Sequence, residues 1–206
     1  MKPSRPLRLY RHPLSGHAHR AQLLLSLLGL PHELVTVNLL AGEQKQPEFL
    51  RRNSFGQVPV LEDGDVTVPD SNAILVYLAE RYDDEGRFWP RSPEGKAAVQ
   101  RWLSVAAGQL AAGPAAARLV RVFQRDIDYA RTLEIAEQLL NVLERELSER
   151  EFLVGSGPTL ADVALYTYVA HGPEGGVSLE PFAAVRRWLG RIERLPGFVP
   201  MQAAEG

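Results

Sequence analysis

Cysteine is absent from this 206-residue sequence. Its absence excludes disulfide bridges, thiolate metal ligands and a redox-active thiol on the protein itself, and it fits a reducing compartment. The apolar run Leu23–Leu30 is interrupted by Ser26 and Gly29, and it is far shorter than the roughly 20 residues that span a bilayer. The net charge of −2 provides no positive excess for nucleic acid or anionic lipid. We therefore expect a soluble, cytoplasmic protein with neither a nucleic-acid nor a membrane partner.

Two short alternating apolar segments flank an acidic Asp-Gly turn. Val58–Leu61 and Val66–Val68 lie on either side of Glu62–Asp65, a pattern typical of a β-hairpin. Because proline has no N–H to donate to a sheet, Pro59 is expected to begin an edge strand or to lie beside one. Val58 would then keep its N–H and C=O available for an extended, peptide-like ligand.

An acid–serine pair stands directly before a predicted helix at 71–82. Asp70 supplies a carboxylate, Ser71 supplies a hydroxyl, and the first helical turn supplies backbone N–H groups. These N–H groups attract a ligand carboxylate, whereas Asp70 attracts a ligand ammonium group. A small peptide that carries both groups at one end would satisfy the whole set.

Periodicity predicts a mixed N-terminal part and a helical C-terminal part. The predicted N-terminal elements are a strand at 7–10, a helix at 18–29, a strand at 33–39 parallel to the first, a short helix at 47–52, the hairpin and the helix at 71–82. Later helices are predicted at 96–123, 127–149, 159–170 and 181–194. Gly108, Gly113 and Pro114 predict a kink in the first of these. Thr159 and Asp162 have capping-box spacing, so we assign them a structural role and no catalytic one.

The segment Gln57–Pro59 followed by Asp70–Ile74 resembles the glutathione-binding half of the glutathione S-transferase family, and the resemblance covers nearly the whole chain. It implies an α/β thioredoxin-like N-terminal domain plus an all-α helical C-terminal domain. The implied boundaries are 1–83 for the glutathione-binding domain, 84–93 for a linker and 94–206 for the helical domain. The resemblance also implies a cis bond before Pro59, glutathione as co-substrate, a role in detoxification and a homodimer.

The chemistry of such an enzyme depends on the glutathione thiol. A reference thiol pKa of about 8.5 leaves only about 3% thiolate at pH 7. Lowering that pKa by about two units requires about 2.7 kcal/mol of preferential thiolate stabilisation. A hydroxyl donor and the positive end of a helix can supply it. The thiolate would then attack a small hydrophobic electrophile without a covalent enzyme intermediate.

Pro13–Arg20 lies where the first strand meets the first helix, and it resembles the serine-type N-terminal motif of bacterial family members. Ser15 is therefore the expected thiolate donor, although an N-cap is the ordinary interpretation of a serine at this position. Counted back from Arg20, His17 falls where some bacterial members place an asparagine that also reaches the sulfur. His17 is thus a second candidate, and Tyr10 in the strand would serve a tyrosine-type mechanism.

The resemblance also implies the other substrate contacts. The expected glutathione-binding residues are Gln44, Lys45, Gln57, Val58, Pro59, Asp70 and Ser71. Gln44 and Lys45 would hold the glycine carboxylate, with a solvated loop as the alternative, and capping is the alternative for Asp70 and Ser71. The second substrate is expected between the domains near Ser15, with the lining residues Leu14, Gln109, Ala112, Pro114 and Tyr166. Small, neutral or apolar side chains favour an uncharged hydrophobic electrophile.

Other sites and functions are less well supported by the sequence. His12, His17 and His19 cluster in the sequence, but no metal site is predicted, because residues two apart diverge on a helix and no Cys or ordered Asp/Glu set completes a site. Arg118, Arg121 and Arg125 share a helical face that is expected to be solvated or to lie between subunits, with substrate lining as the alternative. Two other functions stay open: glutathione-dependent peroxide or disulfide reduction at the same site, and a non-catalytic binding or scaffold module.

Overall fold

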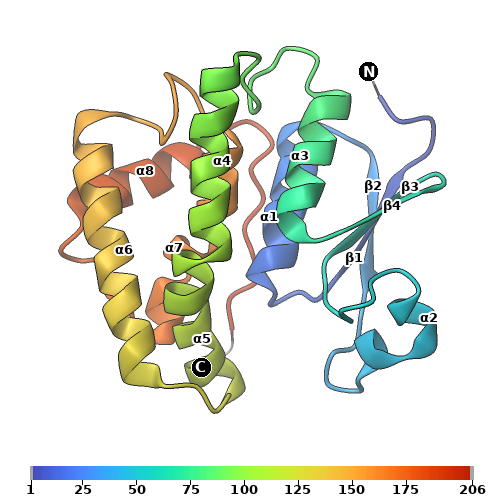
Figure 1. The fold of residues 1–206 in the computed structure, drawn as a ribbon, viewed down its shortest axis with the longest axis horizontal. Coiled ribbons are helices and arrows are strands. Elements are labelled where there is room, and N and C mark those ends of the chain that lie inside the picture. The colour runs from blue at the N-terminus through green and yellow to red at the C-terminus, as the bar shows by residue number, and fades with distance from the viewer. Residues whose placement is uncertain (1, 205–206) are drawn as a thin grey trace. The chain divides into compact units, whose positions relative to one another are not determined.

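The computed structural model describes residues 2–204 and divides into two compact units (Figure 1). The first unit comprises the chain up to Gly86 together with Pro196–Gln202, and the second is built mainly from Arg87–Leu195. A four-stranded mixed sheet with helices forms the first unit, and the regular elements described in the second are helices. The predicted fold class is therefore confirmed. Within residues 2–204, no helix combines the length and apolar character needed to cross a membrane.

The sheet of the first unit has the strand order β2-β1-β3-β4. Its strands are β1 (Leu7–Arg11), β2 (His32–Thr36), β3 (Val60–Asp63) and β4 (Val66–Pro69). β2 is parallel to β1, and β3 and β4 form the predicted antiparallel hairpin. β3 is an inner strand, so Pro59 does not begin an edge strand; it precedes Val60, which pairs with Pro69 of the edge strand β4. The Val58–Pro59 peptide bond is cis, as expected.

β2 is shorter than the sequence predicts. The apolar alternation continues to Leu39, but the register pairs Thr36 with Arg11, the last residue of β1. Val37 donates one further backbone hydrogen bond to the Arg11 carbonyl (2.8 Å). The strand ends at Thr36 because the neighbouring strand ends there, and sequence periodicity does not report where a partner stops.

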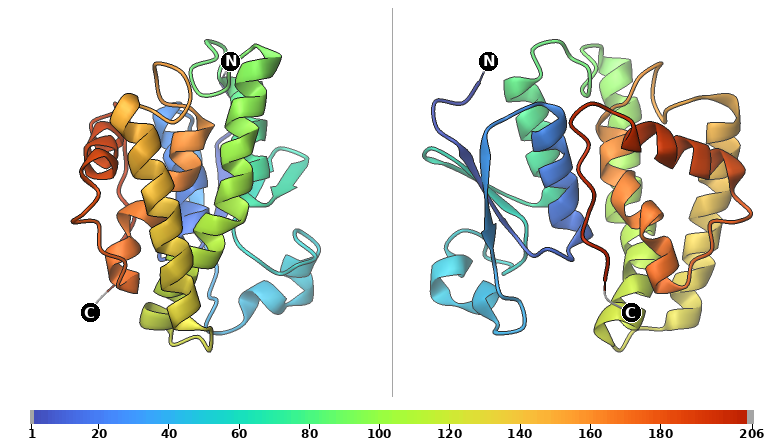
Figure 2. Two further views of the ribbon diagram at one scale, coloured as in Figure 1. Left: turned by 60° about the vertical axis from the view of Figure 1, so that its left-hand side comes forward. Right: turned by 180° about the vertical axis from the view of Figure 1, so that it is seen from behind.

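Side-chain alternation along β1 separates the two faces of the sheet. The helices of this unit are α1 (Gly16–Leu27), α2 (Pro47–Leu50) and α3 (Ser71–Tyr82). Leu7 and Leu9 are fully buried on the face that α1 and α3 cover (Figures 1 and 2). Tyr10 lies on the other face and packs edge-on against Phe49 of α2, with ring centroids 6.4 Å apart. Arg11 belongs, by the same alternation, to the α1 face.

The second unit consists of α4 (Pro93–Ala107), α5 (Ala116–Phe123), α6 (Tyr129–Glu149), α7 (Leu160–Ala170) and α8 (Ala183–Glu193), joined by short irregular segments. The predicted irregularity in the helix over 96–123 is confirmed at Gly108, Gly113 and Pro114: α4 ends at Ala107 with Gly108 as its C-cap, and a π-helical segment, Ala111–Ala115, leads directly into α5. A Cβ atom at Gly113 would lie 2.8 Å from the backbone nitrogen of Ala136 in α6. This glycine therefore permits a close approach of α6 at the π-helical segment, and such segments are a common cause of kinks in helices.

The start of α6 differs from the prediction by two residues. Asp128 accepts a hydrogen bond from the backbone N–H of Arg131 (3.0 Å) and caps the helix. Ile127 therefore lies outside the helix and is 38% exposed. The apolar period suggested an earlier start, but a capping carboxylate outweighs one additional apolar position.

Arg118 corrects the expectation of a solvated arginine face. Its side chain is only 2% exposed, and its Nε donates to Glu174 Oε2 at 2.6 Å. The other carboxylate oxygen of Glu174 lies 2.6 Å from His171 Nδ1. Glu174 belongs to a short 3-10 segment, Gly172–Gly175, that the sequence analysis did not predict. The buried ion pair attaches this segment to α5.

The capping box at the start of α7 is confirmed, and it extends further than its sequence spacing indicates. The buried carboxylate of Asp162 accepts hydrogen bonds from the Thr159 N–H (2.8 Å) and hydroxyl (3.2 Å). It also accepts from the Leu153 N–H (3.0 Å) and from the indole N–H of Trp188 in α8 (2.8 Å). Burial raises the pKa of this carboxyl against the opposing effect of these donors. Asp162 therefore joins α7 to α8.

The segment Pro196–Gln202 follows the last helix of the second unit but belongs to the first, where it runs along α1 (Figure 2). Gly197 has φ +87°, and a Cβ atom there would lie 2.7 Å from the carbonyl oxygen of Ser26. Two turns closer to the start of α1, the Nε2 atom of His19 lies 2.9 Å from the carbonyl oxygen of Val199. These two contacts orient the segment antiparallel to α1.

Candidate functional site

Ser15 lies at the junction of β1 and α1, where it caps the helix. Its Oγ accepts a hydrogen bond from the Ala18 N–H (3.2 Å), and its carbonyl accepts from the His19 N–H (2.9 Å). The sequence predicted a start at Ala18. This cap explains why α1 begins at Gly16 instead. The bond from Ala18 uses a lone pair of the hydroxyl, so its proton can be donated to a ligand. Capping and sulfur binding are therefore compatible at the same hydroxyl.

His12 shapes the loop that presents Ser15. Its Nδ1 accepts a hydrogen bond from the Leu14 N–H (3.3 Å), and its carbonyl accepts from the Ser15 N–H (3.0 Å). Burial and the nearby Arg11 cation lower the pKa of His12, which favours the neutral ring that this acceptor role requires. From the sequence, His12 was a candidate only as a metal ligand. In the part of the chain that the structure describes, no group of three His, Cys, Asp or Glu side chains is arranged to hold a metal ion.

His17 follows on the first turn of α1 and is neutral at physiological pH. Burial, with a smaller effect from the Arg20 cation, lowers the pKa of His17 to about 3. A neutral imidazole can donate one N–H to a ligand, but it provides no positive charge. Any stabilisation of a thiolate by His17 would therefore come from a hydrogen bond and not from an ion pair.

This pKa predicts a pH-dependent stability. Because the pKa of His17 is lower in the folded chain than its usual value of 6.5, the unfolded chain binds the extra proton, and stability falls as the pH falls below 6.5. One proton contributes at most about 1.4 kcal/mol per pH unit. Urea unfolding at pH 7, 6 and 5 should give a smaller loss of stability in His17→Gln than in the wild type. Equal pH slopes in the two proteins would contradict this assignment.

Arg20 links α1 to the start of α3. Its buried guanidinium donates to Asn72 Oδ1 at 2.9 Å and lies 3.4 Å from Ser71 Oγ. The sequence analysis used Arg20 only to align the motif around Ser15. The structure adds that this side chain joins the helix that carries Ser15 to the acid–serine pair. Nothing in the local pattern identified Asn72 as its acceptor, because the two residues are far apart in sequence.

Asp70 and Ser71 form the cap of α3. Asp70 has φ +79°, uncommon for a residue with a side chain, and its Oδ1 accepts from the N–H groups of Asn72 and Ala73 (2.9 Å each). Its carbonyl accepts from the Ile74 N–H (3.0 Å). Of the four N–H groups that begin a helix, these bonds leave that of Ser71 for a ligand. Asp70 is therefore a helix cap, the alternative role considered for it, and the cap does not use the N–H of Ser71 at the same helix end.

The turn at Gln44 and Lys45 contacts the loop before β3. Lys45 Nζ donates to the Phe55 carbonyl (3.0 Å), and a Cβ atom at Gly56 would lie only 2.6 Å from the Gln44 carbonyl oxygen. Buried Asn53, which the sequence analysis did not single out, donates to the Gln57 carbonyl (2.8 Å). The residues expected to bind the backbone and the glycine end of glutathione are therefore neighbours.

Gly56→Ala tests the importance of this close approach. The added Cβ would collide with the Gln44 carbonyl at 2.6 Å, so the turn must move away from the loop. We expect the KM for glutathione to rise about tenfold, which corresponds to ~1.4 kcal/mol, with a much smaller effect on kcat. Gly64→Ala is the matched control, since Gly64 also has a positive φ (+59°) but no atom within 4 Å of the added Cβ. An equal rise in both variants would indicate a backbone effect alone.

Tyr10 lies on the face of the sheet that carries α2, opposite the α1 face. Its hydroxyl donates to Glu62 Oε2 (3.0 Å), and the Arg52 guanidinium lies 4.8 Å from its ring centroid. Burial and the hydrogen bond to Glu62 raise the pKa of Tyr10. These contacts engage the hydroxyl in a polar cluster at α2, so we do not propose a sulfur-binding role for it.

The residues expected to line the electrophile site fall into a first group with exposed side chains and a second group with buried ones. Leu14 is partly exposed in the loop beside Ser15, and Gln109 and Ala112 are exposed in the helical unit. Pro114 is buried within the π-helical segment. Tyr166 is also buried, and its hydroxyl donates to Glu193 Oε1 (3.1 Å), while burial raises its pKa above the usual range. Only the first group offers side-chain surface to a ligand.

Comparison with known proteins decides the family. Residues 5–80 match the glutathione S-transferase N-terminal domain, and residues 100–196 match the C-terminal domain of the same family. The chain belongs to the glutathione S-transferase family. Glutathione S-transferase 3 of Zea mays is 36% identical over 97% of this chain and 94% of its own length. The crystal structure of a glutathione S-transferase from Pseudomonas fluorescens has a TM-score of 0.90 at 32% identity, covering 96% of this chain and 99% of that one.

A further structural relative carries a ligand. Ure2p5 of Phanerochaete chrysosporium was cocrystallised with 1-(S-glutathionyl)-2,4-dinitrobenzene; it has a TM-score of 0.83 at 26% identity, covering 94% of this chain and 91% of that one. As a member of the glutathione S-transferase family, the protein is an enzyme that transfers glutathione to electrophiles, as predicted. The reductase and scaffold alternatives are not favoured over this activity.

Proposed function

We propose that Ser15 binds the sulfur of glutathione and stabilises its thiolate, with neutral His17 as a second hydrogen-bond donor. The observation that carries this proposal is the bond from the Ala18 N–H to Ser15 Oγ, which fixes the hydroxyl at the N-terminus of the twelve-residue helix α1. The hydroxyl proton can be donated to a ligand at the positive end of the helix dipole, where negative charge is favoured. The sulfur thus receives a hydrogen bond and a favourable field together.

We propose that the remaining parts of glutathione lie along the other capped segments. Asp70 and Ser71 would bind the end that carries both an ammonium and a carboxylate group, because the α3 terminus offers charges of both signs. Val58 and Pro59 would contact the peptide backbone. Lys45 would pair with the glycine carboxylate beside Gln57, since an ammonium group has further N–H donors beyond the one that meets Phe55.

Gln44 has a feature that supports its place in this site. Its Oε1 is buried and has no hydrogen-bond partner among residues 2–204, and its Nε2 makes only a long contact with the Leu39 carbonyl (3.5 Å). A buried amide oxygen without a partner is unfavourable. A peptide N–H of glutathione would satisfy it.

For the electrophile we propose contacts with Leu14, Gln109 and Ala112. Pro114 and Tyr166, which are buried, would support this surface from behind. These neutral side chains suit an uncharged aromatic or alkyl group. The dinitrobenzene conjugate in Ure2p5 supports an activated aryl halide as the test substrate. A cytoplasmic location and a role in detoxification are proposed from the family resemblance.

We also propose a homodimer, with Phe55 in its interface. The backbone around Phe55 is held by hydrogen bonds from its N–H to Asn53 Oδ1 (3.0 Å) and from Lys45 to its carbonyl (3.0 Å), yet its side chain is 79% exposed. An exposed aromatic side chain on a backbone held by hydrogen bonds is typical of a contact residue. Phe55→Ser should shift the mass measured by light scattering from dimer to monomer. Leu40→Ser, at a residue 95% exposed, should leave a dimer; a monomeric wild type would refute the proposal.

The thiolate proposal is tested by ultraviolet titration of glutathione bound to the wild type, Ser15→Ala and His17→Ala. We expect a bound-thiol pKa about two units below the free value of about 8.5, and we expect Ser15→Ala alone to abolish most of that shift. A shift lost only in His17→Ala would assign the main role to His17. A wild-type pKa equal to the free value would refute thiolate stabilisation by either residue.

A further inference from the structure

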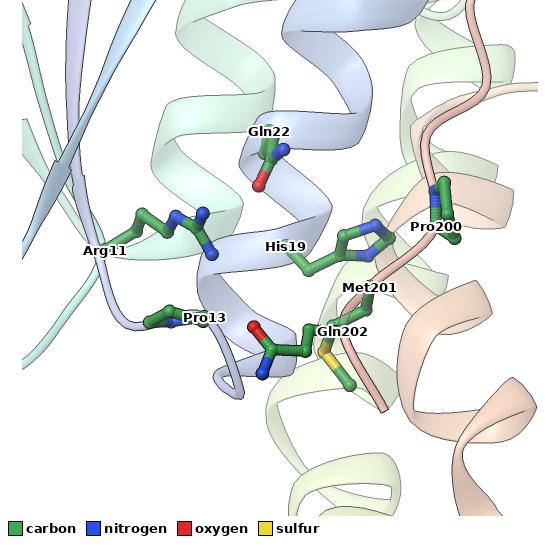
Figure 3. Close-up of a pocket in the computed structure, with 7 residues that line it drawn as sticks. All are labelled: Arg11, Pro13, His19, Gln22, Pro200, Met201 and Gln202. Carbon is green, nitrogen blue, oxygen red and sulfur yellow. The ribbon is translucent and has the colours of Figure 1, made fainter. Parts of the chain in front are cut away.

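The C-terminal segment (Pro196–Gln202) lies against the helix that carries Ser15, although it follows the last helix of the second unit. Figure 3 shows Pro200–Gln202 beside His19, which is one helical turn along α1 from Ser15. None of these C-terminal residues belongs to the set that we assign to glutathione or to the electrophile. The contact between the segment and α1 therefore requires its own explanation.

His19 joins this segment to the first turn of α1 through two different groups. Its side chain is buried, and its Nε2 lies 2.9 Å from the carbonyl oxygen of Val199. A carbonyl oxygen only accepts, so this nitrogen carries the proton and donates it. The backbone N–H of His19 donates to the carbonyl of Ser15 (2.9 Å). One residue is thus bonded both to the C-terminal segment and to the residue whose hydroxyl we assign to the sulfur.

A polar pocket limits the packing of the segment near this bond. The pocket has a volume of about 270 Å³ and lies between the end of β1, α1 and the C-terminal segment (Figure 3). Arg11, Gln22 and Gln202 bring polar side chains to it, and no aspartate or glutamate lines it in the described chain. A polar pocket of this size favours hydration over close packing. The bond from His19 to Val199 therefore contributes a larger part of what holds the segment on α1 here.

The first turn of a helix opens more readily than its middle unless other contacts hold it. Opening of this turn in α1 would break the bonds from the Ala18 and His19 N–H groups to Ser15. Arg20 holds one face of the turn, since its guanidinium donates to Asn72 of α3 (2.9 Å). His19 lies about 100° away around the helix, and its bond to the C-terminal segment holds a second face.

We propose that His19 is a positioning residue for the thiolate: through its bond to Val199, the C-terminal segment holds the first turn of α1 and keeps the Ser15 hydroxyl in place at the sulfur. This inference rests on the proposed role of Ser15. His19 acts only through Ser15 and does not contact glutathione. The C-terminal segment thereby supports the sulfur site, although none of its residues is assigned to a substrate.

The test compares the thiol pKa of bound glutathione in the full-length wild type, His19→Leu and His19→Gln by ultraviolet titration. Leucine cannot donate a hydrogen bond, whereas the glutamine amide can place an N–H near the position of the histidine Nε2. We expect His19→Leu to raise the bound-thiol pKa by about one unit, from about 6.5 to about 7.5. The thiolate fraction at pH 7 then falls from about 76% to about 24%, and kcat falls about threefold.

The KM for glutathione should change by less than about twofold in His19→Leu, because the proposal assigns no glutathione contact to this residue. His19→Gln should restore most of the wild-type pKa. An unchanged bound-thiol pKa in His19→Leu would overturn the proposal, since a loss of stability alone does not shift that pKa.

The double variant Ser15→Ala/His19→Leu separates an indirect role from a direct one. If His19 acts through Ser15, His19→Leu should raise the thiol pKa no further in the Ser15→Ala background. An equal rise in both backgrounds would mean that His19 reaches the sulfur by another path. If Ser15→Ala leaves the wild-type shift in place, the assignment of Ser15 fails and this inference fails with it. If Ser15→Ala abolishes the shift and His19→Leu keeps it, only this inference fails.

Gly197→Ala tests the C-terminal segment without changing His19. The added Cβ would lie 2.7 Å from the carbonyl oxygen of Ser26, near the other end of α1, so the segment must move away from the helix. We expect the bound-thiol pKa to rise, as in His19→Leu. Gly29→Ala is the matched control, since Gly29 follows α1 and also has a positive φ (+61°), but the described chain has no atom within 4 Å of the added Cβ. An equal rise in Gly29→Ala, or no rise in Gly197→Ala, would show that the segment does not position Ser15.

Discussion

Ser15→Ala is expected to lower kcat/KM for the conjugation of glutathione to 1-chloro-2,4-dinitrobenzene by about 25-fold at pH 7. The hydroxyl at the start of α1 is the donor that we assign to the sulfur. Raising the bound-thiol pKa from about 6.5 to about 8.5 lowers the thiolate fraction at pH 7 from about 76% to about 3%. The pH dependence of kcat/KM should shift upward by the same amount. At a pH above the free thiol pKa, the kcat/KM of the variant should therefore approach that of the wild type.

Two controls separate this chemistry from helix capping. Ser15→Thr keeps a hydroxyl that can both cap and donate, so it should retain most of the activity. Ser92→Ala removes an N-cap of the same kind, since Ser92 Oγ accepts from the Gly95 N–H at the start of α4 (3.1 Å). That variant should lose about 1 kcal/mol of stability and little activity. A similar loss of activity in Ser92→Ala and Ser15→Ala would contradict the assignment of Ser15.

Asp162→Ala is expected to lower the free energy of unfolding by about 4 kcal/mol, the largest stability effect that the structure predicts. The substitution leaves three buried N–H groups without their acceptor: those of Leu153, Thr159 and the Trp188 indole. Each buried donor without a partner is unfavourable by about 1–3 kcal/mol. The measurement is urea unfolding followed by tryptophan fluorescence, to which Trp188 is one of three contributors.

Asp128→Ala is the matched control for Asp162. Asp128 also caps a helix of the second unit, but its carboxylate accepts a hydrogen bond only from the Arg131 N–H, at the exposed start of α6, within the described residues. We expect a loss of about 1 kcal/mol. Equal destabilisation by the two substitutions would mean that capping alone, and not the connection of α7 to α8, accounts for the role of Asp162.

These residues illustrate how far local patterns extend. The caps at Ser15, Asp70 and Thr159 could be predicted from the sequence because each involves N–H groups only two or three residues away. The bond from Trp188 to Asp162 spans 26 residues and has no local signature. Similarly, apolar periodicity predicted the strand over 33–39, but only the length of β1 determined that β2 ends at Thr36.

The sequence by itself determined the family, the fold class, the order of the main elements and the capped helix ends that we assign to glutathione, because these depend on short-range periodicity and on motifs of adjacent residues. Tertiary structure alone decided that Arg118 is buried against Glu174, that Gly56 permits contact with Gln44, and that Pro196–Gln202 returns to α1. It also left Arg11 in a pocket without an acidic partner. Such features depend on which distant segments pack together. A buried arginine needs a partner for its charge, whereas an arginine in solvent is hydrated, and the local sequence does not distinguish the two.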